Sequence, residues 1–265
     1  MLILLPPSEG KTAPVTGAPA DPAELWLPRL APARRRVLSR LVALSRRTSA
    51  RGVADSLAVL GLSAAQHGEV VRNAGLATAP AAEVYTGVLY EALDPAGLAP
   101  DARGRLDEQV VVFSGLWGVL RLTDRIPAYR CSVGVALPVL GGLTAYWRKA
   151  LGPALDRAAA DGPVLDLRSG AYAAMWTPSG AAAGRTATVR VLHERILDGA
   201  PRRSVVSHFN KATKGRLVRA LAEAGAPPGS VDELVGALRD LKYTVEERPV
   251  ATGRPRQLDV IVREL

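Results

Sequence analysis

The chain has 265 residues, of which 48% are hydrophobic, and 34 Lys and Arg against 25 Asp and Glu give a formal net charge of +9. This apolar content excludes a disordered chain, and no apolar run approaches the ~18 residues of a membrane-spanning helix. The single cysteine, Cys131, excludes an internal disulfide and favours the reducing cytoplasm. We therefore expect a cytoplasmic protein that makes no contact with a membrane.

Apolar periodicity predicts the elements in chain order. The first part predicts a strand at residues 2–5, a loop at 8–22 and a helix at 33–60. A second helix, capped by Ser63, follows at 63–75, and a short extended segment at 84–87. The second part predicts strands at residues 110–113, 164–167, 186–193 and 204–207. It predicts helices at 144–160, 211–224 and 231–240, and a terminal hairpin of 241–247 with 257–263.

Strands and helices intermix here without the strict alternation of a doubly wound fold. The pattern favours an α+β fold, with a mixed sheet flanked by helices, and one compact domain over residues 1–265 without internal repeats. The three histidines, His67, His193 and His208, are far apart, so we expect no metal site and no cofactor.

The stretch from Ser114 to Arg130 carries the densest set of polar side chains. It follows the apolar run 110–113, and Ser114-Gly115 predicts a tight turn at the strand end. The basic, acidic and phenolic residues that follow are Arg121, Asp124, Arg125, Tyr129 and Arg130. Guanidinium groups at this density suit a phosphate, a carboxylate or a nucleic-acid backbone. The alternative is a surface loop in which Arg and Asp pair with each other.

Three further segments supply candidate side chains. Ser8, Lys11 and Thr12 follow the first strand, where polar site residues often project. Tyr85 and Thr86 either present two hydroxyls at one rim or pack at the core edge and cap the next element. Ser169 belongs to a polar segment after the strand 164–167.

A basic helix start gives the strongest argument from residues alone for a polyanion. Lys211 and Lys214 lie on adjacent turns, and Arg219 follows Lys211 at helical spacing. A basic stripe near a helix start opposes the helix dipole unless an anion neutralises it. Eight Arg and no acid occur between Glu24 and Asp55, so the basic excess is clustered. A solvated helix face is the alternative for the Lys211 segment.

These motifs resemble the signatures of the YaaA peroxide-stress family, and the chain is identified as a divergent member of actinobacterial type. The matching positions are Lys11, Thr12, Val84, Tyr85, Thr86, Gly87, Ser114, Gly115, Leu116, Gly118, Leu120, Arg121, Asp124, Tyr129, Arg130, Leu167, Ser169, Tyr172, Lys211, Gly215 and Arg219. Ser132 and Ala171 stand where the family has Glu, so the role of those acids cannot be carried over. The resemblance implies a role in limiting iron-driven oxidative damage. It also implies a basic cleft and a helix-hairpin-helix-like element that binds DNA, for which the turn Gly115–Gly118 is the candidate.

Two functional hypotheses follow. The first is binding of DNA or another phosphate-bearing polyanion through Ser8, Lys11, Thr12, Tyr85, Thr86, Ser114, Gly115, Arg121, Arg125, Tyr129, Arg130, Ser169, Lys211, Lys214 and Arg216. The second is an enzyme for a phosphorylated or carboxylated small molecule or nucleotide, with Lys11, Asp124 and Lys211 as catalytic residues. Spread of these residues over an open face favours DNA, and convergence in a pocket favours the enzyme. The sequence leaves the oligomeric state open.

Overall fold

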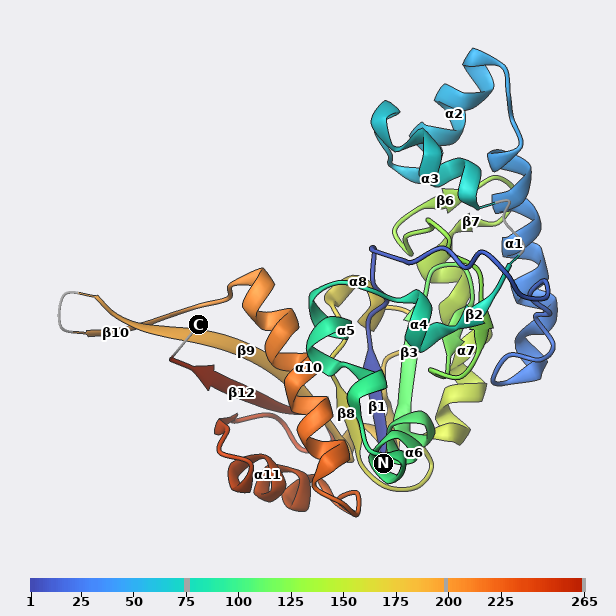
Figure 1. Ribbon diagram of the computed structural model, residues 1–265. Helices are drawn as coiled ribbons and strands as arrows, with labels where there is room; N and C mark the ends of the chain where they lie inside the picture. The colour runs from blue at the N-terminus through green and yellow to red at the C-terminus, as the bar shows by residue number, and fades with distance from the viewer. Residues whose placement is uncertain (74–76, 198–199, 264–265) are drawn as a thin grey trace.

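An eight-stranded mixed sheet forms the centre of the computed structural model, which describes residues 1–73, 77–197 and 200–263 (Figure 1). The strand order is β11-β12-β9-β8-β1-β3-β4, and β10 pairs with β9 outside this path. Its strands are β1 (Leu2–Leu5), β3 (Val110–Ser114), β4 (Gly118–Leu120), β8 (Val164–Asp166), β9 (Thr186–Leu197), β10 (Ala200–Ser204), β11 (Thr244–Arg248) and β12 (Arg256–Val262). Two small antiparallel pairs stand apart: β2 (Ala79–Pro80) with β5 (Arg125–Ile126), and β6 (Ala136–Leu137) with β7 (Gly141–Gly142).

The central strands β3, β1, β8, β9 and β12 run parallel to one another. Every residue of β1 is a buried Leu or Ile, as expected for a strand covered on both faces. Ile3 pairs with Val110 of β3 and with Leu165 of β8. The carboxyl ends of β1, β3 and β8 therefore meet at one edge of the sheet, and this edge collects the polar segments that follow these strands.

Helices pack around the sheet. The α-helices are α1 (Ala31–Ser45), α2 (Ala50–Leu60), α3 (His67–Arg72), α4 (Ala81–Val84), α5 (Val88–Leu93), α6 (Pro100–Gln109), α7 (Leu143–Ala158), α8 (Gly170–Ala173), α9 (Gly180–Gly184), α10 (Ser207–Glu223) and α11 (Val231–Asp240). Short 3-10 helices are η1 (Pro28–Leu30), η2 (Ala64–Gln66) and η3 (Pro95–Gly97). Figure 1 shows α10 beside α5, and the hairpin of β9 and β10 extending away from the rest of the fold.

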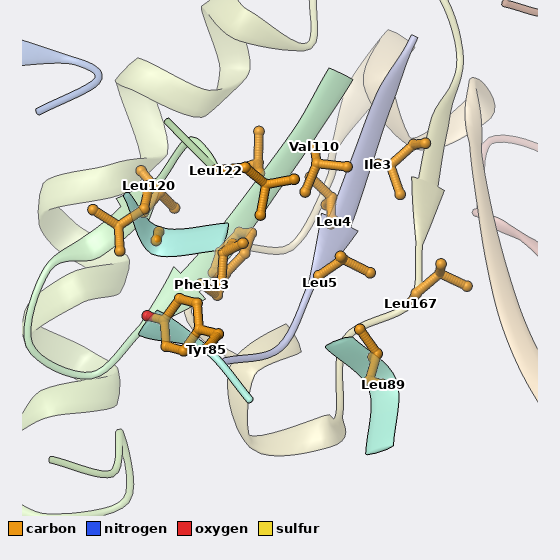
Figure 2. Close-up of a cluster of buried hydrophobic side chains, with 14 of the residues drawn as sticks. Ile3, Leu4, Leu5, Tyr85, Leu89, Val110, Phe113, Leu120, Leu122 and Leu167 are labelled. Carbon is orange, nitrogen blue, oxygen red and sulfur yellow. The ribbon is translucent and has the colours of Figure 1, made fainter. Parts of the chain in front are cut away.

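The core joins the strands to the helices that cover them. Figure 2 shows Ile3, Leu5, Val110 and Phe113 among the buried side chains, with Tyr85 near the end of β3. The Tyr85 hydroxyl points away from the aliphatic side chains in this view. This ring therefore links the core to the polar edge of the sheet. In the part of the chain that the structure describes, no helix combines the length and the hydropathy required to cross a membrane.

The predicted mixed sheet with flanking helices is confirmed, and so are the terminal hairpin and the strand at residues 2–5. Two element predictions are wrong. The helix over 33–60 is divided, because the Ser49 side chain accepts a hydrogen bond from the Gly52 amide and begins α2. The strand over 204–207 does not form, because Ser204 ends β10 and Ser207 begins α10. The predicted helix end at Gly75 lies outside the described residues.

The turn Gly115–Gly118 is not the hairpin of a helix-hairpin-helix element. It joins β3 to β4, which are antiparallel strands, so it is a tight β-hairpin. Gly118 has a φ of +75°, a conformation that favours glycine. Its Cα faces the Trp147 ring so closely that a Cβ would lie 2.8 Å from it. The glycines of this signature therefore serve a buried turn.

Candidate functional site at the carboxyl ends of the parallel strands

A chain of three hydroxyl groups lies beyond the end of β3. The Tyr129 hydroxyl is 2.6 Å from Ser114 Oγ and 2.8 Å from the Tyr85 hydroxyl. Ser114 Oγ also accepts a hydrogen bond from the Trp117 amide at 3.0 Å, which fixes its position. All three side chains are buried, and burial raises the pKa of Tyr85 and of Tyr129 well above the usual value. Both phenols therefore stay protonated and able to donate at neutral pH.

Lys11 lies over the rings that carry these hydroxyl groups. Lys11 and Tyr85 form an isolated antiparallel bridge, and the Thr12 amide donates to the Val84 carbonyl at 2.9 Å. Lys11 Nζ donates to the Ser8 carbonyl at 2.6 Å and is 4.4 Å from the centre of the Tyr129 ring. Burial, followed by the charge of Arg130, lowers the pKa of Lys11 to about 8. Part of the Lys11 population is therefore a neutral amine at neutral pH.

Arg130 completes the site on its open side. Its guanidinium pairs with Glu9 at 3.2 Å and with Glu69 of α3 at 3.3 Å. Its backbone is held by Asn73, whose side chain donates to the Arg130 carbonyl at 3.1 Å and accepts from its amide. Beside Lys11 lies a cavity of about 30 Å³, which is about the space of one water molecule. It is lined by Glu9, Lys11, Glu69, Arg72, Ala128, Tyr129 and Arg130.

Glu9, Glu69 and Asn73 were missed by sequence reasoning. Glu69 and Asn73 lie more than fifty residues before Arg130 along the chain, and no local pattern connects the two segments. Glu9 has a usable signal, since it lies between Ser8 and Lys11 in the segment that follows β1. We call Lys11, Tyr85, Ser114, Tyr129, Arg130 and Glu9 the strand-end site.

Cys131 and Tyr172 border the same region. Burial raises the pKa of the Cys131 thiol to about 12, although the nearby Lys11 opposes the rise. Burial also raises the pKa of Tyr172 to about 12, against hydrogen bonds to the Val133 backbone and the Ser132 side chain. Contact between Ser132 and Tyr172 brings together the two segments in which Ser132 and Ala171 replace family glutamates. Both departures therefore alter one region beside Lys11.

The other predicted residues of these segments either make backbone contacts or are exposed to solvent. Ser8 Oγ donates to the Thr86 carbonyl, and the Thr86 amide donates to the Gly10 carbonyl at 3.1 Å. Thr12 is exposed, as is Ser169 at the start of α8. A Cβ on Gly115 would lie 2.4 Å from the Cys131 carbonyl, so this glycine permits two backbone segments to touch.

Arg121, Asp124 and Arg125 do not join the strand-end site. The Asp124 carboxylate accepts from the backbone amides of Trp26 and Arg121, at 3.1 and 2.9 Å, and burial raises its pKa. The Arg121 guanidinium donates to the Val110 carbonyl at 3.0 Å and stacks on the Trp26 ring. Arg125 donates to the Thr78 carbonyl at 2.8 Å. These three side chains hold the loop after β4 in place.

The basic residues of α10 are also separated from one another. Lys214 is buried and donates to the Leu167 carbonyl at 2.9 Å, and burial lowers its pKa while Asp166 opposes the shift. Lys211 and Arg216 are exposed. Nearby, Arg168 forms a buried bidentate pair with Asp166, at 2.6 and 2.8 Å. The basic excess of this region is thus divided between internal pairs and solvent, and the expected cleft does not gather these side chains.

The family model described as peroxide stress protein YaaA matches residues 1–248. The chain belongs to this family. A UPF0246 protein of Streptomyces coelicolor is 56% identical, with all of both chains covered. One from Corynebacterium efficiens is 40% identical over 99% of this chain and all of its own, and one from Corynebacterium glutamicum is 37% identical over 94% and 96%. The resemblance that the motifs indicated is therefore confirmed across the chain.

The structure brings together five of the matched YaaA-family positions. Lys11, Tyr85, Ser114, Tyr129 and Arg130 come from four separate segments of the sequence and meet at one place. The alternative that Tyr85 packs at the core edge also holds, since its ring is buried while its hydroxyl joins the polar chain.

Proposed function

We propose that this YaaA-family protein is an enzyme whose strand-end site binds the phosphate or carboxylate of a small molecule. The observation that carries the proposal is the convergence of Lys11, Tyr85, Ser114, Tyr129 and Arg130 at the carboxyl ends of parallel strands. In open α/β sheets this edge is where ligands generally bind. Buried phenols, a serine hydroxyl and an amine of lowered pKa form a set able to move protons.

Arg130 is the anion-binding group in this proposal. Its guanidinium already holds the carboxylate of Glu9, and the Glu9 side chain is 79% exposed. An incoming carboxylate or phosphate can take the place of Glu9 without leaving Arg130 unpaired, because Glu9 can turn into solvent. Guanidinium groups bind such anions through short, charge-assisted hydrogen bonds. The cavity beside Lys11 then opens toward the ligand.

The test is stabilisation by simple anions. Inorganic phosphate and glycolate should raise the thermal midpoint of the wild-type chain in a concentration-dependent way. Arg130→Gln should abolish the rise. Arg125→Gln is the matched control, because Arg125 is exposed and donates only to the Thr78 carbonyl among its described hydrogen bonds. Equal responses of the two variants would contradict the proposal.

DNA binding is a second candidate function, favoured by a different surface. Exposed arginines lie from η1 through α1 to the start of α2, with no acidic residue between Leu25 and Ala54; these are Arg29, Arg35, Arg36, Arg40, Arg46, Arg47 and Arg51. Arg35 among them pairs with Asp21 at 3.4 Å. We call these seven the α1 arginine face. It suits a phosphate backbone, which is bound through charge and without sequence preference. Binding there would hold the protein on the polymer that iron-driven peroxide chemistry damages, and we propose limitation of that damage as its role.

Salt dependence tests this second function. Duplex DNA binding should weaken steeply with salt, with a log–log slope of about −0.9 for each phosphate contacted. The triple change Arg36→Gln, Arg40→Gln and Arg47→Gln should flatten the slope. A triple change at the exposed Arg157, Arg239 and Arg254 removes the same charge elsewhere and should leave the slope close to that of the wild type. A slope that responds equally to both triples would indicate net charge alone and exclude the α1 arginine face.

A further inference from the structure

We infer that Lys11 is a nucleophilic amine and that the ligand of the strand-end site carries an aldehyde or ketone carbonyl close to its anionic group, with which Lys11 forms an imine. This inference rests on the proposed enzyme function and names its substrate class. It is carried by the position of one amine beside a cavity, above a buried phenol chain and next to an arginine.

The contacts of Lys11 Nζ leave it without a carboxylate partner. Its hydrogen bonds in the described part of the chain go to the carbonyls of Ser8 and Glu9, at 2.6 and 3.5 Å. The nearby acids, Glu9 and Glu69, pair instead with Arg130. A lysine that served only to neutralise an acid would be found in an ion pair. Here the acids are held by the arginine, and the amine faces aromatic rings and the cavity.

The surroundings of Lys11 also favour its neutral form. Desolvation is the main cause of the lowered pKa, and the positive charge of Arg130 adds to it. Glu9, Cys131 and Glu69 oppose the shift without cancelling it, and the pKa is about 8. At neutral pH roughly one-tenth of such an amine is unprotonated, against less than about one-thousandth of an exposed lysine. Burial next to another cation is a known way of activating a lysine for attack on carbonyl compounds.

The reaction balances without an oxidant or a reductant. The Nζ lone pair attacks the carbonyl carbon, and the carbon–oxygen π electrons move to oxygen, which takes up a proton. The amine loses a proton, the hydroxyl leaves as water with a second proton, and a protonated imine remains. Overall, a lysine ammonium and a carbonyl give an iminium and one water. The Tyr85–Tyr129–Ser114 hydroxyl groups, in which both phenols stay protonated, are the donors we assign to the departing oxygen.

The chain contains its own controls. It has five lysines, and Lys149, Lys211 and Lys242 are exposed while Lys214 is buried against the Leu167 carbonyl. None of these four lies at the strand-end site. A reagent that reacts with lysines only by exposure will label the three exposed ones first. Preferential reaction at Lys11 therefore reports the site.

The experiment is reductive trapping on the full wild-type chain at pH 7.5 with sodium cyanoborohydride, read out by peptide mass spectrometry. The probes are glyoxylate, which joins an aldehyde to a carboxylate, glycolaldehyde phosphate, which joins an aldehyde to a phosphate, and uncharged glycolaldehyde. We expect at least one anionic probe to label Lys11 at least about tenfold faster than Lys149, Lys211 and Lys242, because Arg130 holds its anion beside an amine that is more often unprotonated than an exposed one. Glycolaldehyde should show a much smaller preference, and the faster of the two anionic probes identifies the anion.

Two outcomes would overturn the inference. One is labelling of Lys11 no faster than that of the exposed lysines with both anionic probes, and the other is an equal preference with uncharged glycolaldehyde. Arg130→Gln should slow labelling by the anionic probes more than labelling by glycolaldehyde, because it removes the anion partner as well as the positive charge that favours neutral Lys11. If phosphate or glycolate stabilises the wild type but not Arg130→Gln while no imine is trapped at Lys11, the imine inference fails and the proposed anion-binding function stands.

Discussion

The guanidinium of Arg130 and the carboxylate of Glu9 lie 3.2 Å apart, at the mouth of the cavity beside Lys11. Glu9 thus occupies the position that the proposed ligand anion would take. Glu69 holds the other side of the same guanidinium, so Arg130 stays oriented when Glu9 leaves.

Glu9→Gln should therefore tighten anion binding, because it removes a competing carboxylate and keeps the length of the side chain. The dissociation constant of phosphate or glycolate, measured by titration calorimetry, should fall by up to about fivefold, since an exposed ion pair contributes about 0.2–1 kcal/mol. Glu24→Gln, at an exposed site away from Arg130, serves as the control. Weaker binding by Glu9→Gln would show that Glu9 helps to hold the ligand.

Tyr129→Phe should destabilise the fold, because the Tyr129 hydroxyl is the middle of three buried hydroxyl groups. Its removal leaves Ser114 and Tyr85 each short of one partner, and a buried unpaired polar group costs about 1–3 kcal/mol. Urea denaturation gives the free energy of unfolding. Tyr146→Phe is the matched control, since Tyr146 donates from a partly buried position to the Ala33 carbonyl at 3.0 Å, and its loss should cost less.

The sequence places Lys11 and Ser114 after strands, and a parallel sheet then brings both to one edge. Sequence patterns alone do not show that β1 lies between β3 and β8, so they could not predict which strand ends meet. The roles of Glu69 and Asn73 depend on how α3 packs against the loop at Arg130, which no local pattern encodes. Matched family motifs marked five residues that converge from distant segments, although the matched Arg121, Asp124 and Lys211 do not join them.

Arg121 and Asp124 show why spacing misleads about a site. Their types and proximity suggested an anion site or a mutual ion pair, and the structure instead has Asp124 accepting from backbone amides. A short acidic side chain in a turn satisfies local backbone donors before it can serve a ligand. Residue types and spacing alone do not distinguish these uses.

Arg34→Met should be severely destabilising. Arg34 is fully buried and donates to six backbone carbonyls, those of Pro22, Leu25, Trp26, Leu27, Trp117 and Val119. Arg34, Val37 and Leu41 share one helix face, a signal in the sequence that this arginine points inward. Loss of the guanidinium leaves buried carbonyls unpaired, and we expect a cost of about 3 kcal/mol or more. Arg40→Met, on the exposed face of the same helix, should stay within about 0.5 kcal/mol.

Lys11 should make stability depend on pH in a defined window. Its pKa is about 8 in the folded chain and 10.5 as the ordinary value, so the unfolded chain binds more protons between these two pH values. Stability linked to Lys11 therefore rises as pH increases from about 8 to 10.5. The measurement is the free energy of unfolding of the wild type and of Lys11→Met at each pH. The difference between the two should rise across this range, because the contributions of the other titrating groups are the same in both proteins and cancel in the difference. A constant difference would show that Lys11 titrates as an exposed lysine.

Gly215→Ala should destabilise the contact between α10 and α5. A Cβ at position 215 would lie 2.2 Å from the Leu89 carbonyl, so the two helices would have to separate. Overpacking of this kind costs about 1–3 kcal/mol, which outweighs the gain in helix propensity. Gly236→Ala in α11 is the control, because a Cβ at position 236 would meet nothing within 4 Å among the described residues, and it should stabilise the chain by about 0.5–1 kcal/mol. Guanidinium denaturation of both variants checks the pair, and equal effects would mean that Gly215 owes its place to backbone freedom and not to close packing.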